Sequence, residues 1–223
     1  MNTTVAEKDK GWSSLVDDWS ADKQTFDVPW GKLMMWIFLL SDTFIFSIFL
    51  TGYMSVRMTA TAEWPPTSEV FALMINGHHV PLLLIAIMTF ILITSSGTMA
   101  MAVNYAYQGK KKRVFWLMIT TAILGASFVG MQAFEWTKLI VDEGVRPWSN
   151  PMGAEQFGAS FFMITGFHGL HVTAGVIYLT VVANRVRKGY YDNKGFHIVE
   201  ITGLYWHFVD LVWVFIFAFF YLW

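Results

Sequence analysis

The sequence contains no cysteine and few charged residues. With no cysteine among its 223 residues, the chain can form no disulfide, thiolate metal site or nucleophilic thiol, which excludes copper–thiolate and iron–sulfur centres within it. Charged residues make up only 14% of the chain, and the formal net charge of -1 gives no indication of a nucleic-acid partner.

Hydrophobic residues are abundant instead. They make up 55% of the chain and aromatic residues 17%, which is typical of membrane proteins rather than soluble domains. A membrane-spanning helix needs roughly 20 mostly apolar residues, and five segments qualify, at about 33–55, 80–106, 114–135, 157–186 and 198–223. The sequence therefore predicts an all-α integral membrane protein, with a bundle of five transmembrane helices formed by residues 31–223.

The basic residues predict how the bundle is oriented. If the N-terminus is inside, twelve of the 15 lysines and arginines fall on the inner side, and only Arg57, Lys138 and Arg146 fall outside. This bias predicts that the N-terminus is inside and the C-terminus outside. Residues 1–30 carry mixed charge and lack a basic stretch followed by a small-residue cleavage site, so we expect a cytoplasmic tail rather than a secretory signal.

Several ionisable residues fall within the predicted spans, where such residues are rare and usually face the bundle interior or a water-filled path. They are Asp42, Glu135, His168, His171, His207 and Asp210. Asp42 has no basic residue in its own span, so we expect a protonated carboxyl that donates one hydrogen bond; a role in proton uptake is the alternative. Glu135 follows Gln132 by one helical turn and is expected to make a polar contact between helices.

The stretch GFHGLHVTAG, residues 166–175, places His168 and His171 on one face of the fourth predicted helix. With a rise of about 1.5 Å per residue, His168 and Asp210 lie at similar depths in a bilayer core about 30 Å thick. The short connection between the last two helices predicts that they are antiparallel neighbours. We therefore expect His168 or His171 to meet His207 or Asp210 across their contact.

Small residues in the same stretch predict close packing. Gly166, Gly169 and Thr173 follow helical spacing, which would let the backbone of another helix approach.

Three functions are open for the histidine pair: a structural contact, a proton or water path, and ligation of a metal or haem. Two axial histidines must approach a porphyrin from opposite sides, whereas residues three apart project from one helix face. The residues therefore favour the structural reading and predict no metal or haem ligand in this chain.

The same stretches resemble subunit III of the haem-copper terminal oxidases, the cytochrome c and quinol oxidase family. The motifs are WPPT at 64–67, LLSDTFIFS at 39–47, GMQAFEW at 130–136, FFMITGFHGLHV at 161–172 and YWHFVDLVWVF at 205–215. They occur in family order, and the resemblance covers residues 30–223.

The resemblance implies the five-helix form of the family. The longer, seven-helix form has two additional helices, and the cleft between these and the rest holds phospholipids. Arg185 stands at the position of a family arginine that contacts a lipid phosphate, and Arg187 and Lys188 beside it complete the predicted lipid-binding group. Asp42 takes the place of a family carboxyl, often Glu, that reacts with a carbodiimide, which agrees with a protonated buried acid.

The resemblance also implies the function. In this family, oxygen reduction and the main proton channels belong to subunit I, and the dinuclear copper site, where present, belongs to subunit II. We expect an accessory subunit of a proton-pumping terminal oxidase that stabilises subunit I and supports proton uptake and lipid binding, with haem and copper only in its partner subunits. Subunit I is the expected main contact, subunit II, small subunits and membrane phospholipids are further candidates, and a bacterial cytoplasmic membrane is the expected location.

Two alternatives stay open. One is the subunit-III-like accessory protein of a nitric oxide reductase, and the other is a haem-bearing membrane anchor. The residues do not decide between cytochrome c and quinol as the electron donor, because that choice lies in subunit II.

Overall fold

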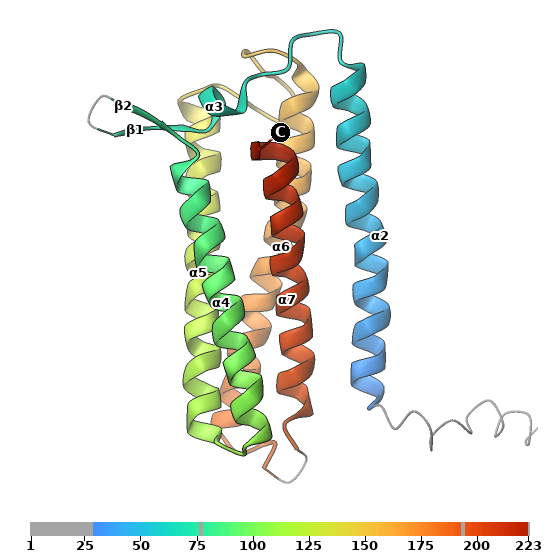
Figure 1. Cartoon of the computed structure of the whole chain (residues 1–223), viewed down its shortest axis with the longest axis vertical. Helices are drawn as coiled ribbons and strands as arrows, with labels where there is room; N and C mark the ends of the chain where they lie inside the picture. Colours follow the sequence, from blue (N-terminus) through green and yellow to red (C-terminus); the bar gives the residue numbers. More distant parts are fainter. Residues whose placement is uncertain (1–28, 76–77, 193–194, 223) are drawn as a thin grey trace, which may run out of the picture.

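A computed structural model describes residues 29–75, 78–192 and 195–222. Its long helices stand side by side and alternate in direction, so that consecutive ones are antiparallel (Figure 1). They are α2 (Trp30–Thr59), α4 (Leu83–Tyr107), α5 (Lys111–Val141), α6 (Glu155–Arg187) and α7 (His197–Phe217), which continues as the π-helical turn η2 (Ala218–Leu222).

The five predicted spans are confirmed, because each of these helices is long and apolar enough to cross a membrane. Most helices extend beyond the predicted ranges. For example, α5 covers Lys111–Val141 instead of 114–135, since an apolar run marks only the part of a helix that lies in hydrocarbon. The predicted tail, residues 1–30, lies outside the described residues apart from its last two positions.

The connection between α2 and α4 contains an element that was not predicted. After Pro65 and Pro66 the chain forms a one-turn helix, α3 (Thr67–Val70), and then an antiparallel hairpin of β1 (Ala72–Ile75) and β2 (His78–Pro81). The helix predicted at 80–106 therefore begins at Leu83, because the chain up to Pro81 pairs with β1. The hairpin projects from one end of the bundle (Figure 1).

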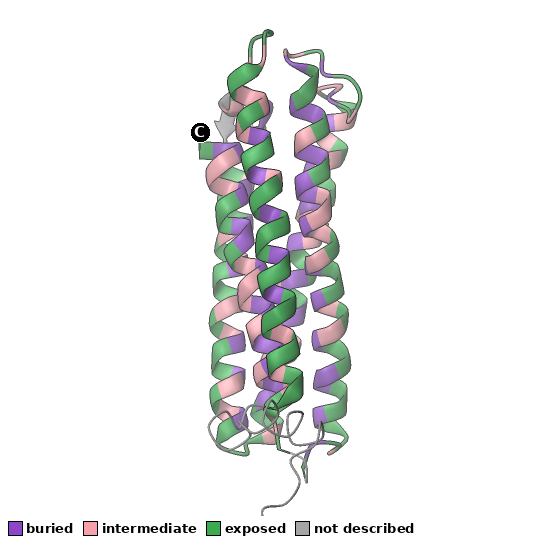
Figure 2. Ribbon diagram, turned by 90° about the vertical axis from the view of Figure 1, so that its right-hand side faces the viewer, coloured by how far each residue is buried: buried purple, intermediate pink, exposed green. Residues whose placement is uncertain are grey.

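The last helix, α7, lies between several others. It packs against α4, α6 and α2, while α5 packs against α4 and α6. The predicted antiparallel contact between the last two helices, α6 and α7, is therefore confirmed. Buried positions follow the inward side of each helix and exposed positions its outward side (Figure 2), as expected for helices surrounded by lipid.

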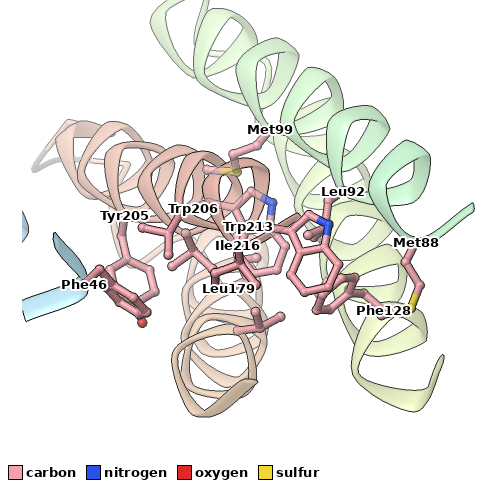
Figure 3. Packing of buried hydrophobic residues seen from close by; sticks show 14 of the residues in the cluster. Phe46, Met88, Leu92, Met99, Phe128, Leu179, Tyr205, Trp206, Trp213 and Ile216 are labelled. Carbon is pink, nitrogen blue, oxygen red and sulfur yellow. The ribbon is translucent and has the colours of Figure 1, made fainter. Parts of the chain in front are cut away.

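Trp206 of α7 is the side chain around which the helices pack most closely (Figure 3). Its indole ring lies over Gly125 of α5 and Gly175 of α6, and a Cβ atom on either glycine would press against the ring. The indole N–H donates a hydrogen bond to Oγ of Ser95 in α4, at 3.0 Å. One side chain thus joins four helices.

Within the described part of the chain, no helix makes the close approach predicted at Gly166, Gly169 and Thr173. A Cβ atom on Gly166 would meet only the ring of Trp136, and Gly169 has open space around it. This face of α6 borders a groove of about 550 Å³ between α5 and α6. Spacing revealed a face of small residues, but the close approach occurs at Gly175, on the side of α6 that faces α7.

Replacing Gly125 by Ala tests the packing at Trp206. The added methyl group would press on the indole ring, so we expect G125A to lower the free energy of unfolding by about 1–3 kcal/mol, the usual cost of overpacking. Thermal unfolding of the purified chain in detergent measures the change.

The matched control is G130A on the same helix, where the added methyl group meets open space. It should leave the stability unchanged or raise it by up to about 1 kcal/mol, because Ala favours helix more than Gly does. Equal losses in the two variants would contradict the packing role of Gly125.

Candidate functional site

Asp42 lies inside the bundle, where it meets a histidine. It is 4% exposed, and its Oδ2 lies 3.0 Å from Nε2 of His171, so the contact joins α2 to α6. The other ring nitrogen of His171, Nδ1, lies 2.8 Å from the backbone carbonyl oxygen of Phe167. Because a carbonyl oxygen only accepts hydrogen bonds, Nδ1 carries a proton and donates it.

At 3.0 Å, this contact between a carboxyl oxygen and an imidazole nitrogen has the length of an ion pair or a hydrogen bond. Tyr205 of α7 also donates a hydrogen bond to the backbone carbonyl oxygen of His171, at 2.9 Å.

His168 is enclosed by aromatic rings. It is 1% exposed, its ring stacks on Trp213 at a centroid distance of 5.5 Å, and the ring of Phe128 meets it edge-on at 6.0 Å. Neither ring nitrogen has a hydrogen-bond partner among the described residues. His168 thus packs as a ring of the core. Across the part of the chain that the structure describes, no group of three or more His, Cys, Asp or Glu residues could hold a metal ion.

Glu135 of α5 makes the expected contact between elements. Its Oε2 accepts a hydrogen bond from Nε2 of Gln132 at 2.8 Å and a second from the hydroxyl of Tyr221 at 3.2 Å. Tyr221 belongs to η2, so this carboxyl holds the C-terminal turn of the chain against α5. All three side chains are buried.

A third polar group joins α4 to α7, and we call it the His207 group: Ser96, His207 and Asp210. Oγ of Ser96 lies 2.6 Å from Nδ1 of His207, and Asp210 follows His207 by about one turn of α7. All three residues are partly exposed. Oδ1 of Asp210 is enclosed by protein atoms but has no hydrogen-bond donor among the described residues.

The predicted bridge from His168 or His171 to His207 or Asp210 is wrong. His171 pairs with Asp42 on α2, whereas His207 contacts Ser96 on α4. The predicted depth was nearly right, because His168 stacks on Trp213, one helical turn from Asp210. The predicted direction was wrong, because His207 points to the side of α7 that faces α4 rather than to the side that faces α6.

The predicted lipid-binding residues lie together where α6 ends. Arg185, Arg187 and Lys188 are all exposed, and the guanidinium groups of Arg185 and Arg187 lie over the rings of Tyr190 and Phe115, at 5.8 and 5.5 Å from the centroids. Cations in the last turn also interact favourably with the helix dipole.

A second basic surface lies at the turn between α4 and α5. Residues 110–113, all Lys or Arg, border a hollow of about 620 Å³ together with Tyr105, Trp116 and Leu117. The guanidinium group of Arg113 lies 5.0 Å from the centroid of the Tyr105 ring. Cations around an apolar floor at a helix end are the combination that binds anionic lipid headgroups.

Sequence reasoning missed the hydroxyl groups that complete these contacts, which belong to Ser96, Tyr205 and Tyr221. A hydroxyl in an apolar run is a weak signal, because most such groups bond the backbone of their own helix, as Ser95 also does. Of these three residues, only Tyr205 could have been singled out from the sequence, because it begins the YWHFVD stretch.

Comparisons with known proteins point to one family. The family model described as cytochrome c oxidase subunit III matches residues 18–223. A probable quinol oxidase subunit 3 of Staphylococcus aureus (strain USA300) is 33% identical over 197 residues, which cover 88% of this chain and 90% of that protein. A probable quinol oxidase subunit 3 of Staphylococcus epidermidis is 34% identical with the same coverage of both chains.

Substituting Asp42 tests its contact with His171. In D42L the Nε2 atom of His171 is left without a partner in the bundle interior, so we expect the free energy of unfolding to fall by about 1–3 kcal/mol. D42N should keep most of the stability, because the Asn amide can donate to Nε2. Thermal unfolding in detergent measures both variants.

A double-mutant cycle with His171→Leu provides the control. If the two side chains interact, D42L should cost clearly less in the H171L background than alone. Additive losses would show that Asp42 and His171 do not stabilise each other.

Proposed function

Because the chain belongs to the cytochrome c oxidase subunit III family, we propose that it is the accessory subunit III of a proton-pumping haem-copper terminal oxidase, which reduces oxygen to water in aerobic respiration. The observation that carries the proposal is the family match over residues 18–223, which includes all five helices. In this proposal the chain is a non-catalytic subunit, and the haem and copper centres belong to its partners.

In this proposal the function of the chain is to stabilise subunit I and to support rapid proton uptake. Its buried carboxyls support this reading, because two of them are engaged by side chains of the same chain: Asp42 by His171, and Glu135 by Gln132 and Tyr221. Carboxyl groups that bind side chains of other helices stabilise the bundle, as expected for a structural subunit. In the proposal Asp42 donates one hydrogen bond, to Nε2 of His171, and a role in proton uptake is the alternative.

Phospholipids are the second set of partners. The exposed cations Arg185, Arg187 and Lys188 are suited to lipid phosphates, and the hollow beside Arg113 offers the same chemistry at the neighbouring turn. Lipids bound at both places would fill spaces between this chain and the rest of the complex.

The location and orientation follow from the same proposal. The basic turn between α4 and α5 and the basic end of α6 face the cytoplasm. The N-terminus with its tail of residues 1–30 lies inside and the C-terminus outside, in the cytoplasmic membrane of a bacterium. The printed names of the relatives, quinol oxidase subunit 3, favour quinol as the electron donor of the complex.

The two alternatives are weaker. The names of the relatives favour an oxidase over a nitric oxide reductase. A haem-bearing anchor would need free histidines, whereas His168 is covered by Trp213 and Phe128, and His171 and His207 have partners on other helices.

Replacing Asp42 by Asn tests whether the chain is accessory. We expect the purified oxidase complex with D42N to keep the wild-type haem content per complex, because the substitution touches no haem ligand. Haem content measured from pyridine haemochrome spectra, with subunit composition from gel electrophoresis, checks this. Loss of haem from a fully assembled complex would count against an accessory role.

Removing the subunit tests the function itself. We expect the oxidase without this chain to lose activity during turnover sooner than the complete complex, while its initial rate falls much less. Oxygen consumption followed to inactivation measures both quantities, with the re-added wild-type chain as control. An immediate loss of all activity with the other subunits still assembled would argue for a direct catalytic part.

A further inference from the structure

The His207 group lies at mid-depth in the bundle and faces outward. His207 is ten residues beyond the start of α7, about 15 Å along a helix that spans about 39 Å with η2 included. Ser96, His207 and Asp210 are each partly exposed at this level. Ionisable groups in hydrocarbon are unfavourable unless protein or a water-filled cavity covers them. This group therefore needs a cover that the chain itself does not supply.

The hydrogen bonds within the group show what the cover must offer. Ser96 has a single hydroxyl hydrogen. Either this hydroxyl or Nδ1 of His207 is the donor in the 2.6 Å contact between them. The Asp210 carboxyl is short of donors, because its Oδ1 has none among the described residues.

A cover that brings a hydrogen-bond donor would supply the Asp210 carboxyl with the donor that it lacks. A lipid acyl chain has none, so it would leave this carboxyl without one.

The surrounding surface has the form of a helix-docking face. Leu204, His207, Leu211 and Val214 recur at intervals of three or four residues along α7, and all are partly or fully exposed. This is the spacing of a helix that packs along another helix. On α4, Gly97 and Ala100 flank Ser96 with small exposed side chains, and Gly97 has open space around it, which lets a neighbouring backbone come close.

We propose that a membrane-spanning helix of a partner subunit packs on this face of α4 and α7 and donates a hydrogen bond to the Asp210 carboxyl. The inference rests on the proposed function, because it takes the partner from the same oxidase complex. It adds the surface at which the subunits meet, and the donor chemistry required of the partner.

Cross-linking from single cysteines tests the surface, and the natural chain offers a clean background because it has no cysteine. In the purified complex, L211C labelled with a benzophenone maleimide should form a covalent adduct with another polypeptide on illumination, because Leu211, 55% exposed, lies on the proposed face. I123C is the matched control, since Ile123 is 63% exposed on α5. Its label should react with lipid and give no protein adduct.

The outcomes separate this inference from the proposed function. An adduct from L211C alone supports the inference. Lipid adducts only from L211C, or equal protein adducts from both positions, would overturn it while leaving the proposed function intact. If the wild-type chain does not purify with an oxidase at all, the proposed function fails first.

Substitutions of Asp210 test the hydrogen bond that the partner helix is proposed to donate. We expect D210L to reduce retention of the chain in the purified complex by about 3- to 30-fold, the range for one hydrogen bond between membrane helices, whereas D210N keeps a carbonyl acceptor and should be retained like the wild type. Retention is the amount of chain purified with the complex divided by the amount in the membrane, so a variant that merely fails to accumulate is corrected for. Equal retention of D210L and D210N would overturn the donor contact.

Discussion

The packing of Trp206 against two glycines is the constraint on which the rest of the bundle depends. Because Gly125 and Gly175 carry no side chain, the indole can lie between α5 and α6 while its N–H reaches Ser95 on α4. This fixes the rotation of α7 about its own axis. The rotation turns Tyr205 toward α6, where it bonds the His171 backbone, and turns His207 toward α4. The polar contacts of the molecule therefore follow from an apolar one.

The bilayer imposes the second constraint, since polar groups within it must find partners in protein. Inside the bundle the chain pairs several of these groups itself: Asp42 has His171, Glu135 has Gln132 and Tyr221, and the indole N–H groups of Trp206 and Trp213 have Ser95 and Thr89. The ring nitrogens of His168 have no hydrogen-bond partner among the described residues, but aromatic rings enclose them. The His207 group differs because it is partly exposed on the outer side of the bundle.

The sequence predicted the number and antiparallel order of the helices, because hydrocarbon thickness sets how long an apolar run must be. The depth of side chains in the membrane was also predictable. Counting about 1.5 Å per residue placed His168 of α6 level with Asp210 of α7, and it stacks on Trp213, one helical turn away. The direction of each side chain was not predictable, since it depends on which helices flank each other. Asp42 met His171 rather than standing alone because α2 packs beside α6, and no spacing within one chain reveals that neighbour. The hairpin before α4 was missed for the same reason, because its pairing follows from the loop as a whole.

In the proposed function, the chain serves oxygen reduction without carrying a redox centre of its own. The most direct test is the visible absorption spectrum and the metal content of this chain after its purification away from the other subunits. We predict no haem bands and no stoichiometric copper or iron, together with the helical signal of an intact bundle in circular dichroism. One haem or one copper ion per folded chain would contradict the accessory role.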